Sequence, residues 1–168
     1  MKQVFVWVFF IMLLIVGCED RTDSIPSNMP DDMPHDFNFS LNFGVLGKNE
    51  INTYSGTVTK DLIENGTATA KVTFSNSELA AIYKKMKEIN IVEEKKLIPN
   101  TACSQEPYST DKWEITINGE IYTHVVSGQY CELTSDAEQL IQMRNFVFNF
   151  VKQKEEYRKL PEAVGGYE

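Results

Sequence analysis

Residues 111–126 read DKWEITINGEIYTHVV, and this segment narrows the possible folds more than any other part of the chain. Apolar and polar residues alternate on both sides of Asn118-Gly119, a pair that suits a type I′ turn because both turn positions need a positive φ. A two-residue loop sets Trp113 opposite His124 on a largely apolar face. The segment therefore predicts an antiparallel β-hairpin, with His124 packed against the indole ring.

Three further segments carry the patterns of β-strands. Residues 37–45 alternate strictly between apolar and polar side chains, which predicts a strand with an aromatic face turned inward. Residues 51–60 are rich in Thr, Tyr and Val and predict a second strand. Residues 67–74 alternate again and predict a third.

The turn between the second and third strands contains Asn65-Gly66, which is a hairpin signal. A two-residue loop at this point would set Lys60 opposite Lys71, and like charges facing each other across a sheet cost stability. We therefore expect a longer loop here.

Two helices complete the pattern. Ser75 and Glu78 have the spacing of a capping box ahead of a run with helical spacing, and Ser135 and Glu138 repeat that spacing before a second helix. The element order is then β-β-β-α-β-β-α. This order predicts the α+β class, with an antiparallel sheet of about five strands and two helices packed on one face.

The apolar residues of the second helix cover well over half of its circumference, which indicates deep burial or a surface kept for a partner. Burial is the simpler expectation. Ile141 and Phe148 lie at one side of this arc and form the candidate partner surface. Arg144 falls inside the arc, and we expect it to extend past Phe148 to solvent rather than to pair with a carboxylate.

The N-terminus has the layout of an export signal. Lys2 precedes an uncharged apolar run over residues 4–16, which is shorter than the ~20 residues that span a bilayer. The run ends in the sequence IVGC at Cys18, which resembles the lipobox of bacterial lipoproteins. The resemblance implies that residues 1–17 are a signal peptide, and that Cys18 is lipidated after their removal. The alternative is an uncleaved N-terminal anchor, with Cys18 an incidental thiol.

Residues 18–36 then form a lipidated cysteine and an acidic, proline-containing tether, because they hold too little apolar surface to pack. Residues 37–168 form a single α+β domain. This layout resembles that of small lipoproteins of Gram-positive bacteria, and it implies a location rather than an activity. The expected location is the cell membrane, with the lipid-anchored domain facing outside the cytoplasm.

The formal net charge of −8 argues against a nucleic-acid partner, because phosphates need Lys and Arg. It also argues against binding of basic residues to anionic lipid, so we expect the lipid anchor to make the membrane contact. We expect no cofactor, and the remaining partner is an unknown protein or small molecule.

Cys103 and Cys131 remain once Cys18 is acylated. They flank the hairpin of residues 111–126, so its open end brings them together. An exported chain keeps disulfides, which favours a structural bond closing a loop of about 29 residues. The alternative is a reactive pair of thiols. No Cys or His spacing suits a structural metal site.

Catalytic motifs such as GxSxG, HExxH and the P-loop are absent from the sequence, and the two histidines are His35 and His124. The sequence therefore favours a non-enzymatic binding or interaction module, with no catalytic residue assigned. Two alternatives stay open. One is an envelope hydrolase that uses His124 or a pair of carboxylates, and the other is an inhibitor or immunity-type lipoprotein.

Overall fold

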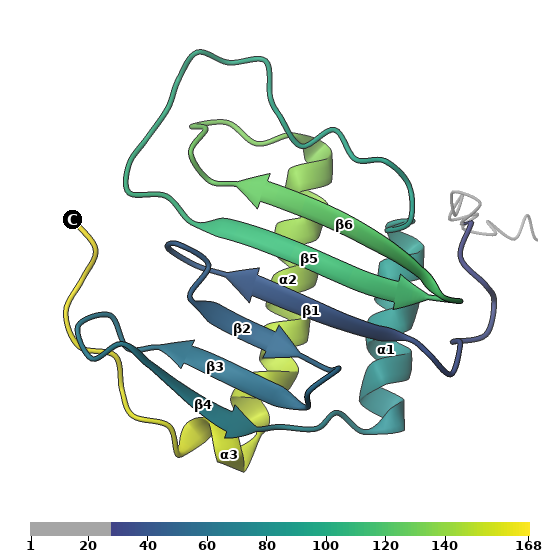
Figure 1. Cartoon of the computed structure of the whole chain (residues 1–168). Helices are drawn as coiled ribbons and strands as arrows, with labels where there is room; N and C mark the ends of the chain where they lie inside the picture. Colours follow the sequence, from purple (N-terminus) through teal and green to yellow (C-terminus); the bar gives the residue numbers. More distant parts are fainter. Residues whose placement is uncertain (1–27) are drawn as a thin grey trace, which may run out of the picture.

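The fold is a single antiparallel sheet with helices on one face, seen in a computed structural model that describes residues 28–168. The sheet faces the viewer in Figure 1, and α1 and α2 lie behind it. The strand order is β4-β3-β2-β1-β5-β6, and all neighbours are antiparallel. The expected α+β class is confirmed. The elements are β1 (Asn38–Phe43), β2 (Asn49–Asn52), β3 (Thr57–Asp61), β4 (Thr67–Lys71), α1 (Asn76–Glu88), β5 (Thr110–Ile117), β6 (Glu120–Ser127), α2 (Ser135–Gln153) and α3 (Glu155–Arg158).

The sheet has six strands because the segment 51–60, predicted as one strand, contains parts of two. The chain reverses between β2 and β3, where the Asn52 side-chain oxygen accepts a hydrogen bond from the Ser55 amide at 3.1 Å. Gly56 follows with φ of 62°, which a glycine adopts without a steric penalty. The turn chemistry of Asn52 and Gly56 therefore overrides the β propensity of the residues between them.

The loop between β3 and β4 is longer than two residues, as expected. Lys60 faces Ala68 and Lys71 faces Thr57, so the two lysines are not opposite each other.

The core lies between the sheet and the two long helices. From the central strand β1, Phe39 and Leu41 are fully buried, and Phe39 packs against the Trp113 ring at 6.1 Å between centroids. Phe150 of α2 is only partly buried, and its ring packs against Phe146 at 5.3 Å. The buried stripe of α2 consists of Ala137, Leu140, Met143, Val147 and Val151.

The two helix starts differ in how well they were predicted. Ser75 and Glu78 form the expected capping box at α1, with both reciprocal hydrogen bonds present. At α2 the N-cap is Thr134, not Ser135, and its hydroxyl accepts a hydrogen bond from the Ala137 amide at 3.1 Å. Because Ala137 has no polar side chain to return a bond, α2 begins with a simple cap.

Residues 28–36 pack against the domain, although the sequence placed them in the tether. Met29 is 4% exposed and belongs to the core. The Tyr83 hydroxyl of α1 donates to the Pro30 carbonyl at 2.8 Å, and Lys87 pairs with Asp31 at 2.6 Å. The prediction that packing begins at residue 37 is therefore wrong: a few anchoring contacts order a segment whose composition is typical of a linker. The signal peptide and Cys18 lie outside the described residues.

Candidate functional site: the free edge of β6

The hairpin of β5 and β6 has the predicted geometry. Asn118 and Gly119 have φ of 51° and 78°, and Trp113 faces His124 in the register of a two-residue loop. Asp36 holds this turn from outside, because its carboxylate accepts hydrogen bonds from the Asn118 amide at 3.1 Å and the Gly119 amide at 2.6 Å. These bonds hold the pKa of Asp36 below its ordinary value. The N-terminal segment thus fixes the end of the hairpin.

This register leaves one side of β6 without a neighbouring strand. A two-residue loop closes on a hydrogen-bonded pair, so alternate residues of β6 bond to β5 and the others point their N–H and C=O groups away. The outward-pointing groups belong to Ile121, Thr123 and Val125, and to Ser127 where the strand ends; we call the first three residues the free edge of β6. Within residues 28–168, the outward-pointing N–H and C=O groups of these three residues make no backbone hydrogen bond to any other segment.

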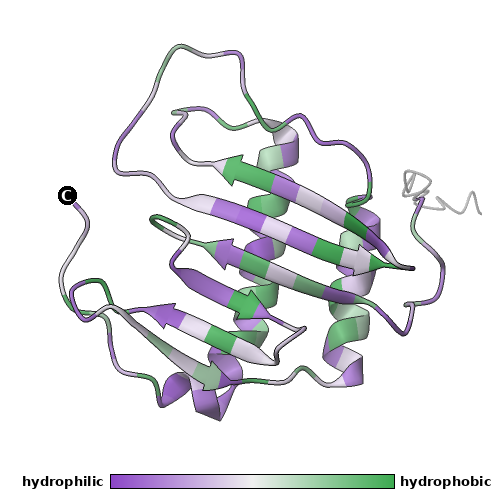
Figure 2. Ribbon diagram, in the orientation of Figure 1, coloured by the Kyte–Doolittle hydropathy of each residue, from purple (hydrophilic) through white to green (hydrophobic). Residues whose placement is uncertain are grey.

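The side chains of the free edge lie on the open face of the sheet, which is the face turned away from α1 and α2. Ile121 is 64% exposed and Val125 is 51% exposed. Their neighbours on β5 are polar, since Val125 faces Lys112 and Ile121 faces Thr116. The ribbon of β6 in Figure 2 carries two green, hydrophobic bands. Two exposed apolar residues beside the unpaired backbone of an edge strand make this edge the candidate contact surface.

The opposite edge of the sheet is protected. On β4 the register places Thr67, Thr69 and Lys71 at the positions that point outward, and α3 packs against this strand. A lysine on an edge strand, and an element that covers the edge, discourage pairing with other chains. The segment of β6 from Ile121 to Ser127 contains no Lys, Arg, Asp or Glu.

His124 lies on the helix face of β6 and is 8% exposed. Its Nε2 atom lies 2.6 Å from the Ile91 carbonyl oxygen, so this ring nitrogen already has a partner. Burial holds the pKa of His124 below its ordinary value, and the charge of Lys95 lowers it further. Among the described residues, no hydroxyl, thiol or carboxylate is hydrogen-bonded to the ring. The site therefore does not bring a nucleophile to His124.

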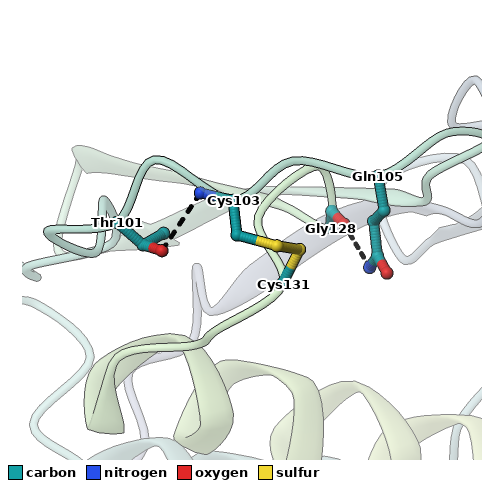
Figure 3. Close-up of a disulfide and its surroundings, with 5 residues drawn as sticks. All are labelled: Thr101, Cys103, Gln105, Gly128 and Cys131. Carbon is teal, nitrogen blue, oxygen red and sulfur yellow. Dashed lines mark hydrogen bonds between the residues drawn. A yellow bond between two sulfur atoms is a disulfide. The ribbon is translucent and has the colours of Figure 1, made fainter.

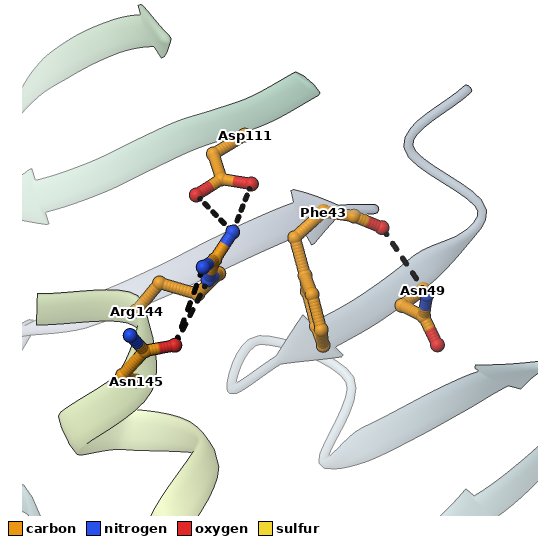
Figure 4. A network of polar contacts seen from close by, with 5 residues as sticks. All are labelled: Phe43, Asn49, Asp111, Arg144 and Asn145. Carbon is orange, nitrogen blue, oxygen red and sulfur yellow. Dashed lines mark hydrogen bonds and ion pairs between the residues drawn. The ribbon is translucent and has the colours of Figure 1, made fainter. Parts of the chain in front are cut away.

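Arg144 does not extend to solvent, contrary to the expectation. Its Nη1 atom donates to both oxygens of Asp111, at 3.0 and 2.9 Å (Figure 4), and Asp111 is 2% exposed. Burial raises the pKa of Asp111, and Arg144 opposes this shift by favouring the charged form. The pair joins α2 to β5 inside the two-layer structure. Its place in the packed interface fits a structural role better than a catalytic one.

The two cysteines are joined as expected. Cys103 and Cys131 form a disulfide with 5.5 Å between their Cα atoms (Figure 3). Beside it, the Gln105 side-chain amide donates to the Gly128 carbonyl at 2.9 Å. The bond and this contact hold the long loop before β5 against the segment after β6.

A cavity of about 450 Å³ lies near the start of β5. Glu106 and Glu168 both line it, so this cavity brings two acidic residues to one space. Its remaining lining consists of Val45, Leu46, Pro107, Tyr108 and Thr110.

The candidate surface on α2 is largely covered. Ile141 and Phe148 are both partly buried against the core. The Phe148 ring packs edge-on against Phe43 at 5.2 Å and against Tyr157 of α3 at 5.6 Å. These contacts leave little of Phe148 for a partner, whereas the free edge of β6 is open. Sequence reasoning missed this edge, although Ile121 and Val125 on the polar face of the predicted hairpin were a visible signal.

Within residues 28–168, no helix is both long enough and apolar enough to span a membrane. The same residues contain no cluster of three or more His, Cys, Asp or Glu side chains that would suit a metal ion. No known protein family matches the sequence, and no curated protein is significantly similar to it.

Proposed function

We propose that this chain is a lipid-anchored, non-enzymatic binding module outside the cytoplasm, and that it binds an extended protein strand along the free edge of β6. The observation that carries the binding proposal is the unpaired backbone of Ile121, Thr123 and Val125 beneath two exposed apolar side chains. Strand addition uses these two components together. Main-chain hydrogen bonds supply affinity, and alternate side chains supply specificity.

The anchor rests on the lipobox-like sequence that ends at Cys18. The described chain begins beside the C-terminal end of α1, where the Asn28 amide donates to the Asn90 side chain at 3.2 Å. An extended chain covers at most ~3.5 Å per residue, so the segment from Cys18 to Asn28 reaches about 35 Å. A lipidated Cys18 would thus hold the domain near the bilayer, where its partners would be envelope proteins.

The anchor is tested with Cys18→Ser in the full chain. Wild-type protein should partition into the detergent phase and incorporate labelled palmitate, whereas Cys18→Ser should incorporate none and remain as an uncut precursor. The matched control is Cys103→Ser, which changes a cysteine of the folded domain and should leave lipidation intact. Lipid incorporation that is unchanged in Cys18→Ser would contradict the proposal.

The binding edge is tested with a photoreactive amino acid at position 125 in the full-length protein on intact cells. We expect protein adducts from this position and none from position 69, which has the corresponding outward register on β4. Thr123→Pro should abolish the adducts, because it removes an N–H that points away from β5 without breaking a bond inside the sheet. Thr69→Pro is the matched control. Adducts that persist in Thr123→Pro would overturn the proposed edge.

A further inference from the structure

We infer that the strand occupying the free edge of β6 belongs to a second copy of this chain, which pairs antiparallel about a two-fold axis at Thr123. This inference rests on the proposed binding edge and names its occupant. The two copies would continue one sheet, with both helix layers on the same face, since the axis is perpendicular to the sheet.

The free edge is complementary to itself. With the axis at Thr123, Ile121 faces Val125 of the second copy, and Thr123 faces Thr123 of the second copy. All three outward-pointing residues then find an outward-pointing partner, and in this register the two apolar residues face each other. A shift of two residues toward Ser127 would instead set Ile121 opposite Ser127 and Val125 opposite Thr123. Apolar side chains meet each other on the open face, and one hydroxyl meets another. Facing threonines already occur in the same sheet, where the Thr59 and Thr69 hydroxyls lie 2.9 Å apart at a non-hydrogen-bonded pair of β3 and β4.

The charge distribution also favours this contact. The whole chain has a formal charge of −8, so two copies repel each other over most of their surface. The segment from Ile121 to Ser127 contains no Asp, Glu, Lys or Arg, and burial favours the neutral form of His124. The acidic residue nearest to this segment along β6 is Glu120. In the proposed register its two copies are about 20 Å apart along the strands, beyond the screening length of about 8 Å at physiological ionic strength.

Pairing also explains the asymmetry between the two edges of the sheet. The edges left in the double sheet are the two β4 strands, which are protected by the charge of Lys71 and by α3. A two-fold axis along the membrane normal would keep the N-terminal segments of both copies at the same height. This arrangement suits two anchors in one bilayer.

The register is tested by thiol crosslinking of full-length protein in membranes, with a reagent that spans about 8 Å. Thr123→Cys should crosslink to itself, because paired Cα atoms in this register are about 5.5 Å apart. Ile121→Cys alone should not, since its two copies are about 14 Å apart. A mixture of Ile121→Cys and Val125→Cys chains should crosslink. Efficient crosslinking of Ile121→Cys to itself would overturn the register.

The strength of the contact is tested by sedimentation of the detergent-solubilised full chain. Wild type and Thr69→Pro should sediment as dimers. Thr123→Pro should raise the dissociation constant at least about 30-fold, because it removes one central backbone hydrogen bond from each copy. Val125→Lys, which leaves the backbone unchanged, is a second variant and should also give monomers. Circular dichroism should show the native fold in both.

The outcomes separate this inference from the proposed function. If wild-type protein is a monomer and Thr123→Cys does not crosslink, the second copy is ruled out. Photoadducts from position 125 to a different protein would then leave the proposed binding edge standing. If position 125 gives no adduct of any kind, both proposals fail.

Discussion

Removing the cation from the buried ion pair of Asp111 and Arg144 is the most demanding test of the packing. Arg144→Met keeps a long apolar side chain but leaves the Asp111 carboxylate, 2% exposed, without its partner. Breaking a buried pair in this way typically costs about 3–5 kcal/mol. The carboxyl group escapes part of this cost by taking up a proton. With an unfolded pKa near 3.8, protonation limits the cost to about 4 kcal/mol at pH 7 and to less than about 2 kcal/mol at pH 5.

The assay is urea unfolding of the full chain, followed by circular dichroism at both pH values. We expect Arg144→Met to be destabilised far more at pH 7 than at pH 5, because a folded pKa raised above the unfolded one makes stability fall as the pH rises between them. Arg144→Lys is the conservative control, since a single nitrogen of Arg144 contacts both oxygens of Asp111. Asp111→Asn should restore most of the stability lost in Arg144→Met. A loss below about 1 kcal/mol at pH 7, or an equal loss at both pH values, would refute the reasoning.

Three further predictions concern the hairpin and its surroundings. Replacing Cys103 and Cys131 with serine should lower the free energy of unfolding by about 3–4 kcal/mol, and a non-reduced digest of wild-type protein should contain one crosslinked peptide. Burial lowers the pKa of His124 in the folded protein below the unfolded value of 6.5. The free energy of unfolding should therefore decrease as the pH falls below 6.5, and His124→Gln should remove this part of the pH dependence. Asn118→Val should cost about 1–2 kcal/mol in urea unfolding, because a β-branched residue resists positive φ, whereas an equal stability of Asn118→Val and Asn118→Gly would show that the turn is different.

Local patterns with their own turn or cap chemistry could be predicted from the sequence. The hairpin at Asn118-Gly119 and the capping box of Ser75 are examples, because the residues that define them are adjacent in the chain. The same adjacency predicted that Cys103 and Cys131 would meet. In each case, the interaction depends on residues within or beside one element.

Features that depend on contacts between residues far apart in the sequence were harder to predict. Arg144 finds Asp111 only when α2 crosses β5, and nothing near either residue in the sequence indicates the other. Residues 28–36 look like a linker until Met29 enters the core and Asp36 caps the distant hairpin. Composition describes how a segment behaves alone, and it does not include the surface that the rest of the fold provides.

The free edge of β6 could be predicted only in part from the sequence. The predicted register already placed Ile121 and Val125 on the polar face of the hairpin. That β6 would be the outermost strand could not be known, because strand order depends on how β1 inserts between β2 and β5. An apolar residue on a polar face becomes informative only when the neighbours of its strand are known.

The position of β1 has a mechanical consequence. The N-terminal part of the described chain enters the sheet at its centre, because β1 lies between β2 and β5 and bonds to both. Just before β1, Asp36 bonds to the turn of the β5–β6 hairpin. Antiparallel hydrogen bonds run perpendicular to the strands, so tension along β1 loads two ladders in shear, and their bonds resist together. The same tension on an edge strand would peel its bonds one after another. A load between residue 28 and a strand bound at β6 would cross β1, β5 and β6 in turn, which makes this the direction in which the domain should unfold most slowly under force.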